Sequence, residues 1–172
     1  MKLNTRSAFF VLILLPLSLS AEVSNLNDNG FTSTNTAEVT ASPAEVYAAM
    51  QNIGSWWNPA HGYTGDASNF YFEPGLGGCF CERFPDGGGV VHLEIIYIAP
   101  EKEIRFEGAL GPLQGLPTHG RMLWNITPTD SGSTITFTFH VTGFMEGGFE
   151  GLAPAVDAVV GEQLTRLADL LK

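Results

Sequence analysis

The sequence contains few basic residues and only two cysteines. Its 172 residues include 8 Lys and Arg against 18 Asp and Glu, which gives a formal net charge of −10 at pH 7. Binding to nucleic acid needs clustered Lys and Arg that displace counterions from the phosphates. Nucleic acid is therefore excluded as a partner, and an anionic membrane surface is disfavoured. Two cysteines are also too few for a small scaffold held together by disulfides.

The common catalytic and cofactor motifs are missing as well. The sequence has no Gly-x-Ser-x-Gly nucleophile motif, no phosphate-binding loop, no dinucleotide-binding fingerprint and no His-Glu-x-x-His zinc motif. We therefore expect no cofactor and no bound metal. Any catalytic site must be assembled from side chains that are scattered along the sequence.

Long apolar runs are absent apart from one near the N-terminus. Residues 1–21 combine the basic Lys2 and Arg6, an apolar stretch over residues 8–15 and small residues up to Ala21, which is typical of a secretory signal peptide. About ten apolar residues are too few to span about 30 Å of hydrocarbon. A retained anchor is thus the less favoured alternative, and no stable membrane insertion is expected after cleavage. We predict export to the periplasm or the extracellular space. Removal of Lys2 and Arg6 leaves six basic residues against 18 acidic ones, a net charge near −12.

The mature chain of about 150 residues has the size of one domain. Residues 22–32 are polar and rich in turn-forming residues, so we predict a short flexible lead-in there and a single domain over residues 33–172. Ser42, Pro43 and Glu45 have the spacing of a capping box with proline at the first helical position. This spacing predicts the start of a helix.

A β-rich segment follows the helices and precedes one long helix. After a second short helix that ends before Pro59, the pattern changes to segments rich in β-branched and aromatic residues, which are typical of antiparallel strands. Apolar residues at helical spacing from Leu152 to Leu171 predict a long amphipathic helix. We predict an α+β fold in which a curved antiparallel sheet wraps around this helix and leaves a cavity. The sheet has about seven predicted strands, at residues 33–41, 69–74, 79–84, 90–100, 103–110, 120–128 and 133–144.

Four motifs accompany this order of elements: SWWNP at residues 55–59, GGCFCERFPDGGG at 77–89, YIAPEKEIRFEG at 97–108 and GPLQG at 111–115. Together they resemble the START-like superfamily, also called SRPBCC or polyketide cyclase and lipid transport, and in particular its exported bacterial members. The resemblance implies a helix-grip fold whose internal apolar cavity receives a hydrophobic ligand. Carriers and cyclases share this fold, so the fold alone leaves the activity open.

We favour a protein that binds or carries a small hydrophobic ligand in this cavity without catalysis. Tryptophan offers a large apolar surface and one donor to such a ligand, and the leucines of a Gly- and Pro-rich loop are suited to cover the cavity. A protein partner is an alternative. The candidate ligand-binding residues are Trp56, Trp57, Cys79, Cys81, His92, Glu94, Leu113, Arg121, Trp124 and Phe144.

Cys79 and Cys81 lie on one predicted strand and share a face. On an extended strand such positions are about 6.5 Å apart, whereas the Cβ atoms of a disulfide lie about 3.8 Å apart, so a bridge requires a kink or a bulge. We favour two unbridged cysteines that line the core or the cavity. The alternatives are the bridge and a metal or redox site shared with His92.

The pairing of this strand with the next has two possible registers. One places Cys81 opposite His92 and Cys79 opposite Glu94, and the other places Glu82 opposite His92. His92 with Glu94 or Glu82 would give a cyclase- or hydrolase-like enzyme its acid and base. Such an enzyme is the alternative function.

Overall fold

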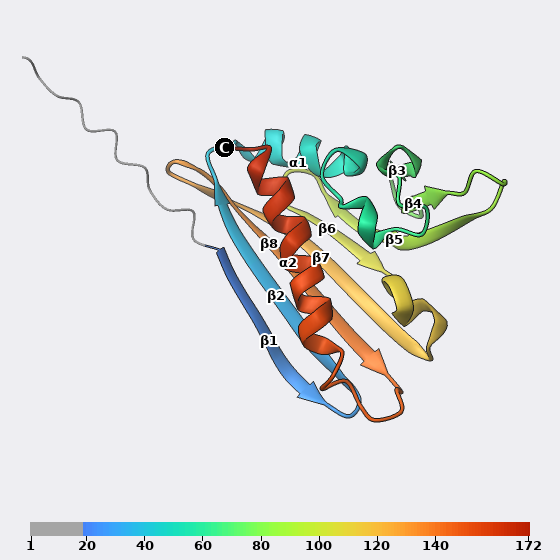
Figure 1. Ribbon diagram of the computed structural model, residues 1–172. Coiled ribbons are helices and arrows are strands. Elements are labelled where there is room, and N and C mark those ends of the chain that lie inside the picture. Colours follow the sequence, from blue (N-terminus) through green and yellow to red (C-terminus); the bar gives the residue numbers. More distant parts are fainter. Residues whose placement is uncertain (1–18) are drawn as a thin grey trace, which may run out of the picture.

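An antiparallel sheet of eight strands forms the protein, and a long C-terminal helix lies across it (Figure 1). The computed structural model describes residues 19–172. The strands follow the spatial order β1-β2-β8-β7-β6-β5-β4-β3, so every neighbouring pair except β2 and β8 is consecutive in sequence. In chain order the strands are β1 (Leu19–Asn27), β2 (Gly30–Val39), β3 (Phe70–Phe72), β4 (Cys79–Arg83), β5 (Gly89–Ala99), β6 (Glu103–Glu107), β7 (Thr118–Thr129) and β8 (Gly132–Gly143).

Two α-helices and four short 3-10 helices, labelled η, accompany the sheet. α1 begins with the predicted capping box, because the Ser42 hydroxyl accepts a hydrogen bond from the Glu45 N–H and the Glu45 carboxylate accepts one from the Ser42 N–H at 2.8 Å. Within residues 19–172, no helix is long and apolar enough to cross a membrane. The helices are α1 (Pro43–Gln51), η1 (Ile53–Ser55), η2 (Pro59–His61), η3 (Ala67–Asn69), η4 (Gly111–Gly115) and α2 (Ala153–Asp169).

The predicted helix-grip fold is confirmed, and the seven predicted strands all form. The predicted flexible lead-in over residues 22–32 is wrong, since these residues form most of β1 and the start of β2. The turn-forming Asp28 and Asn29 make a hairpin between the two strands, and polar residues suit a strand at the sheet edge because it faces water. The predicted signal peptide lies outside the described residues except for its last three, residues 19–21, which begin β1.

α2 packs on the inner face of the sheet, mainly against β2 and β1 (Figure 1). Its apolar stripe, including Val160 and Leu164, is buried there. A polar contact fixes its position, because Ser33 Oγ donates to Asp157 Oδ1 at 2.6 Å and Asn35 Nδ2 donates to the same oxygen at 3.0 Å. The helix therefore leaves the inner face of β4 and β5 to be covered by loops.

β4 and β5 pair with a bulge that neither predicted register contains. Phe80 lies opposite Leu93, whereas the next residue, Cys81, lies opposite Val91. His92 is thus an extra residue on β5, and the neighbours His92 and Leu93 are both buried, as a regular strand with one solvated face would not allow. The bulge turns His92 toward the inside of the protein.

The first predicted register is correct only in part, and the second is not found in the strand pairing. The pairing of Cys79 with Glu94 is confirmed, but Cys81 does not lie opposite His92. The backbone of Glu82 pairs with Val90 rather than with His92, although the side chains of Glu82 and His92 do meet.

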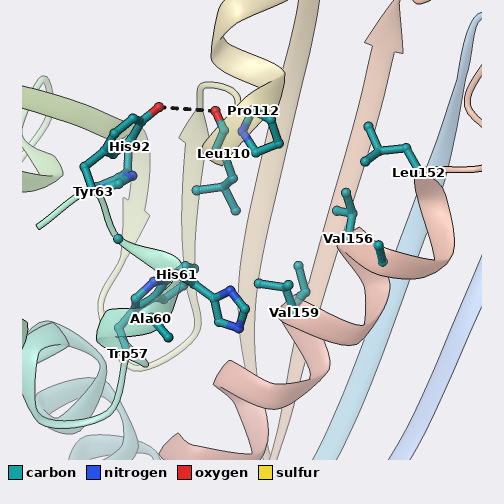
Figure 2. Close-up of a pocket in the computed structure, with 14 residues that line it drawn as sticks. Trp57, Ala60, His61, Tyr63, His92, Leu110, Pro112, Leu152, Val156 and Val159 are labelled. Carbon is teal, nitrogen blue, oxygen red and sulfur yellow. Dashed lines mark hydrogen bonds between the residues drawn. The ribbon is translucent and has the colours of Figure 1, made fainter. Parts of the chain in front are cut away.

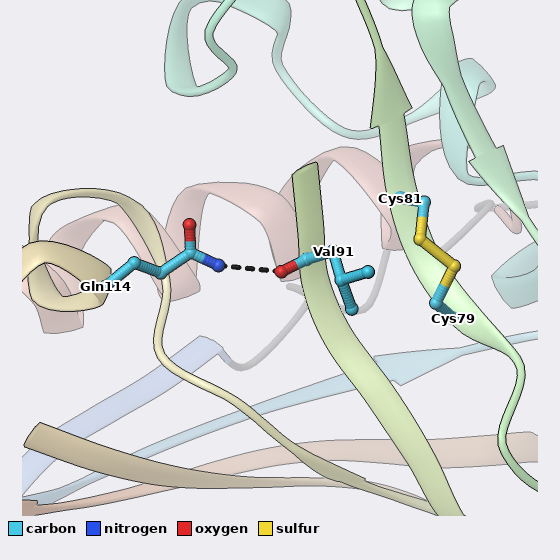
Figure 3. Close-up of a disulfide and its surroundings, with 4 residues drawn as sticks. All are labelled: Cys79, Cys81, Val91 and Gln114. Atoms are coloured by element: carbon cyan, nitrogen blue, oxygen red, sulfur yellow. Dashed lines mark hydrogen bonds between the residues drawn. A yellow bond between two sulfur atoms is a disulfide. The ribbon is translucent and has the colours of Figure 1, made fainter. Parts of the chain in front are cut away.

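The two cysteines of β4 lie beside this bulge. Cys79 and Cys81 form a disulfide with Cα atoms 5.5 Å apart, so the favoured prediction of two unbridged thiols is wrong. This separation is shorter than the about 6.5 Å of an extended strand, and the register of β4 against β5 shifts between Phe80 and Cys81, within the bridged segment. Figure 3 shows the bridge running along β4 beside Val91.

The alternative of a metal or redox site that both thiols share with His92 does not agree with the structure. Cys79 and Cys81 alternate with the inward Phe80 along β4, so the bridge lies on the opposite face of the sheet from His92. Across residues 19–172, no group of three or more His, Cys, Asp or Glu side chains is arranged to hold a metal ion.

The disulfide predicts a simple chemical behaviour. We expect the denatured but unreduced protein to resist iodoacetamide and to be two hydrogens lighter than the reduced chain, because neither sulfur is a thiol. After reduction, both cysteines are expected to take one label each. Intact mass spectrometry measures both states, and two labelled cysteines without reductant would contradict the bridge.

Candidate functional site

A pocket of about 490 Å³ opens between α2, the loop around η2 and the loop that leads into η4. Figure 2 shows side chains of these segments converging, with Val156 and Val159 of α2 across the pocket from Trp57 and Leu110. Its walls are mostly aliphatic and aromatic. The lining residues are Trp57, Ala60, His61, Gly62, Tyr63, His92, Leu110, Gly111, Pro112, Leu152, Ala155, Val156, Val159 and Val160.

Three polar contacts hold the loop around η2 on α2. The Asn58 N–H donates to Gln163 Oε1 at 2.7 Å, and His61 Nε2 lies 2.9 Å from Glu162 Oε2 at the rim. Glu162 also accepts a hydrogen bond from the Asn58 side chain, which is the main reason that its pKa is lowered. The loop and the helix are therefore fastened together where they frame the pocket.

A buried pair of titratable side chains lies at the pocket wall. His92 and Glu82 are 2% and 1% exposed, and His92 Nε2 lies 3.0 Å from Glu82 Oε2. The carboxylate also accepts hydrogen bonds from the Tyr63 N–H at 3.0 Å and the Thr64 N–H at 2.6 Å. The His92 ring stacks on Phe80 with centroids 4.5 Å apart. Both carboxylate oxygens are thus satisfied, as a buried anion requires.

Gly62 allows the loop backbone to reach this carboxylate. A Cβ added at Gly62 would lie 2.5 Å from the Phe70 ring and 3.2 Å from Glu82 Oε1. A larger residue would push the loop away from β4, together with the two N–H groups that follow it. The absence of a side chain at position 62 is therefore part of the site.

Glu82 is anionic and His92 is neutral near pH 7. Burial acts to raise the pKa of Glu82, but the hydrogen bonds from Thr64, Tyr63 and His92 outweigh it, and the pKa is lowered. Burial lowers the pKa of His92, and the hydrogen bond and charge of Glu82 oppose this only in part. The lowered pKa of Glu82 is compatible with the lowered pKa of His92, because the backbone N–H groups stabilise the carboxylate anion without a charged imidazole.

The pair leaves one nitrogen of His92 with an unused lone pair. Because an ionised carboxylate only accepts, Nε2 carries the proton, and Nδ1 is an acceptor. In the described part of the chain, Nδ1 has no hydrogen-bond partner. Unlike Trp57 Nε1, which is also unpaired, it is not fully enclosed. The wall therefore presents a hydrogen-bond acceptor among apolar groups.

Of the predicted ligand-binding residues, the structure places Trp57 and His92 together in the pocket wall. Trp56, Leu113 and Trp124 belong to the hydrophobic core instead. His92 pairs with Glu82 rather than with Glu94. The other candidates lie outside the pocket: Cys79 and Cys81, which are bridged, Glu94 and Arg121, which are exposed on the outer face, and Phe144, which is 68% exposed.

Several lining residues escaped the sequence-based prediction. Val156 and Val159 belong to the predicted apolar stripe of α2, but that stripe is wider than packing on β1 and β2 needs, and the excess lines the pocket. Leu110 and Pro112 belong to the loop that was expected to cover the cavity. Tyr63 carried no signal, because its role depends on the close approach of the loop to Glu82.

Comparison with known proteins agrees with this geometry. Residues 31–172 match the family described as polyketide cyclase / dehydrase and lipid transport. Among solved structures, an uncharacterised protein of Rhizobium leguminosarum has a TM-score of 0.59 at 21% identity and covers 90% of this chain and 97% of its own. A conserved protein of unknown function from Enterococcus faecalis has a TM-score of 0.62 at 13% identity, covering 88% of this chain and 77% of its own.

A third similar structure is the di-domain ARO/CYC StfQ from the steffimycin biosynthetic pathway. Its TM-score is 0.58 at 15% identity, and the match covers 84% of this chain and 51% of StfQ. Such low identities show likeness of fold alone. No protein with a curated description matches. The chain belongs to the polyketide cyclase / dehydrase and lipid transport family and has its ligand-binding SRPBCC fold.

The pair predicts loss of stability in acid. Both pKa values are lowered in the folded state, so the unfolded chain binds more protons as the pH falls. The stability that the pair contributes is complete above the ordinary pKa of histidine, 6.5, and is lost as the pH falls below it and then below the ordinary 4.5 of glutamate. We expect the free energy of unfolding, measured in urea, to fall from pH 7 to 4.

Two variants isolate the contribution of His92. His92→Phe is expected to flatten the part of this decline that begins near pH 6.5, whereas His119→Phe, at an exposed histidine of the outer face, should leave it unchanged. A wild-type stability that stays constant from pH 7 to 5 would contradict a neutral buried imidazole.

Proposed function

We propose that the protein binds or carries a small hydrophobic molecule in the pocket between α2 and the two loops. The observation that carries the proposal is the pocket itself, whose volume of about 490 Å³ lies within the roughly 300–1,000 Å³ of small-molecule sites. Burial of apolar ligand surface stabilises such a complex by about 25 cal/mol per Å² before the costs of association. Membership of a ligand-binding family supports the same function.

We also propose that the protein acts in the periplasm or outside the cell. The composition of residues 1–21 supports export. The disulfide between Cys79 and Cys81 supports it too, because disulfides persist mainly in oxidising compartments.

Filling the pocket is expected to weaken binding. N-phenyl-1-naphthylamine is a neutral apolar probe whose fluorescence rises when it leaves water, and we expect it to bind the wild-type protein. Ala155→Trp places an indole in the pocket and should weaken binding at least about tenfold. Ala158→Trp is the matched control, because Ala158 lies on the same helix but does not line the pocket.

Fluorescence titration of the three proteins tests the proposal. Equal losses in both variants, or undiminished binding to Ala155→Trp, would show that the probe binds elsewhere. Failure of the wild-type protein to bind the probe would contradict an apolar binding function.

The second candidate is an acid–base enzyme of the cyclase or hydrolase type. The Glu82–His92 pair favours it, because a neutral imidazole oriented by a carboxylate is suited to take a proton from a bound molecule. The expected reaction class is proton abstraction next to a carbonyl group or activation of a hydroxyl.

Deuterium exchange at the acidic methylene of 2-tetralone, followed by NMR in D₂O, tests this candidate. A catalytic pair should make exchange about 100-fold faster with the wild-type protein than with His92→Phe, since general base catalysis contributes at least that much. His119→Phe should match the wild type. Equal exchange rates with the wild type and His92→Phe would exclude the pair as a catalyst of proton abstraction from such ketones.

A further inference from the structure

The pocket has a charge environment that disfavours organic anions. In the described part of the chain, none of its lining residues is Lys or Arg. Two carboxylates border it, Glu82 behind His92 and Glu162 beside His61, and the pKa of each is lowered, so that both are anionic. A carboxylate group entering this pocket would be buried without an opposite charge, which is costly.

The buried polar group at the pocket wall is an acceptor. His92 Nδ1 has its lone pair free, while Nε2 is occupied by Glu82. The neighbouring Tyr63 hydroxyl is within reach of Gly111 O at 3.4 Å (Figure 2) and of Gln114 Oε1 at 3.3 Å, so its proton is shared with the η4 loop. A ligand that offered only acceptors would cover Nδ1 and leave it unpaired among apolar groups, which is unfavourable.

We propose that the ligand is an uncharged, mostly apolar molecule with a weakly acidic hydroxyl group, a phenol or an enol, that donates a hydrogen bond to His92 Nδ1. This inference rests on the proposed binding function and adds the chemical class of the ligand. The Glu82 carboxylate, hydrogen-bonded to the other ring nitrogen, makes Nδ1 a better acceptor, and phenols and enols are stronger donors than aliphatic alcohols. The aliphatic walls then accept the rest of the molecule.

Four pyrenes of nearly equal size test the inference: 1-hydroxypyrene, 1-methoxypyrene, pyrene and pyrene-1-carboxylate. Dissociation constants come from their own fluorescence. We expect wild-type protein to bind pyrene-1-carboxylate more weakly than 1-methoxypyrene. We expect the affinity ratio of 1-hydroxypyrene to 1-methoxypyrene to be three- to tenfold higher in the wild type than in His92→Phe, roughly the effect of one hydrogen bond.

The substitution has a matched control. His92→Phe keeps a ring against Phe80 and removes the acceptor, while Glu82 keeps its two backbone donors. His119→Phe makes the same change at an exposed residue of the outer face and should keep the wild-type ratio. Comparing ratios cancels the difference in hydration between the hydroxyl and methoxy compounds.

A second measurement needs no variant. The absorption edge of 1-hydroxypyrene bound to the wild-type protein should move to longer wavelength than that of the dye in a non-basic apolar solvent, because its hydroxyl donates to an imidazole. The edge of bound 1-methoxypyrene should not move.

The outcomes separate the inference from the function on which it rests. Suppose that pyrene and 1-methoxypyrene bind. An unshifted absorption edge of 1-hydroxypyrene, or the same affinity ratio of 1-hydroxypyrene to 1-methoxypyrene in the wild type and His92→Phe, would then overturn the hydroxyl inference. Neither result would contradict the apolar binding function. Tighter binding of pyrene-1-carboxylate than of 1-methoxypyrene would also overturn it. Failure of all four compounds to bind would overturn the proposed function itself.

Discussion

The β-bulge between β4 and β5 is the constraint on which the candidate site depends. Without the extra residue, alternation along β5 would turn either His92 or Leu93 outward, because neighbouring residues of a regular strand face opposite sides. With it, Leu93 fills the core while His92 reaches Glu82. The disulfide spans the residue of β4 at which the register shifts, and the Gln114 side chain donates to Val91 O at 2.7 Å on β5 (Figure 3). Contacts outside the pocket therefore fix what faces into it.

Burial of the Glu82 carboxylate couples the pocket walls to one another. The anion is stable inside because the loop after η2 supplies two backbone N–H groups, and Gly62 lets that loop come close. The beginning of the same loop is fastened to α2 through Asn58 and Gln163. A displacement of α2 would thus move the donors that hold Glu82, and with them the orientation of His92. A chain of hydrogen bonds thus links the helix, the loop and the buried pair.

Local signals were sufficient to predict most of the fold but not the site. The capping box at Ser42 and the apolar stripe of α2 depend on residues a few positions apart, and both are found in the structure. The β1 hairpin was missed because polar residues with turn formers read as a loop unless the partner strand is known. The bridge of Cys79 and Cys81 was misjudged because an extended β4 was assumed. The irregular pairing beside it is a property of two strands and cannot be recognised from the sequence of either strand alone. Which residues line the pocket depends on loop contacts that pattern does not encode.

Carriage and catalysis require different things of the same imidazole. A carrier needs Nδ1 of His92 only to accept a hydrogen bond from the resting ligand, whereas an enzyme that takes a proton must also stabilise the anion that forms. In the described chain no Lys or Arg lines the pocket, and the unpaired indole N–H of Trp57 is fully enclosed. Behind the neutral imidazole lies the carboxylate of Glu82, whose negative charge would repel an oxyanion. The arrangement thus stabilises a neutral hydroxyl compound better than its conjugate base, and this difference favours binding over proton abstraction.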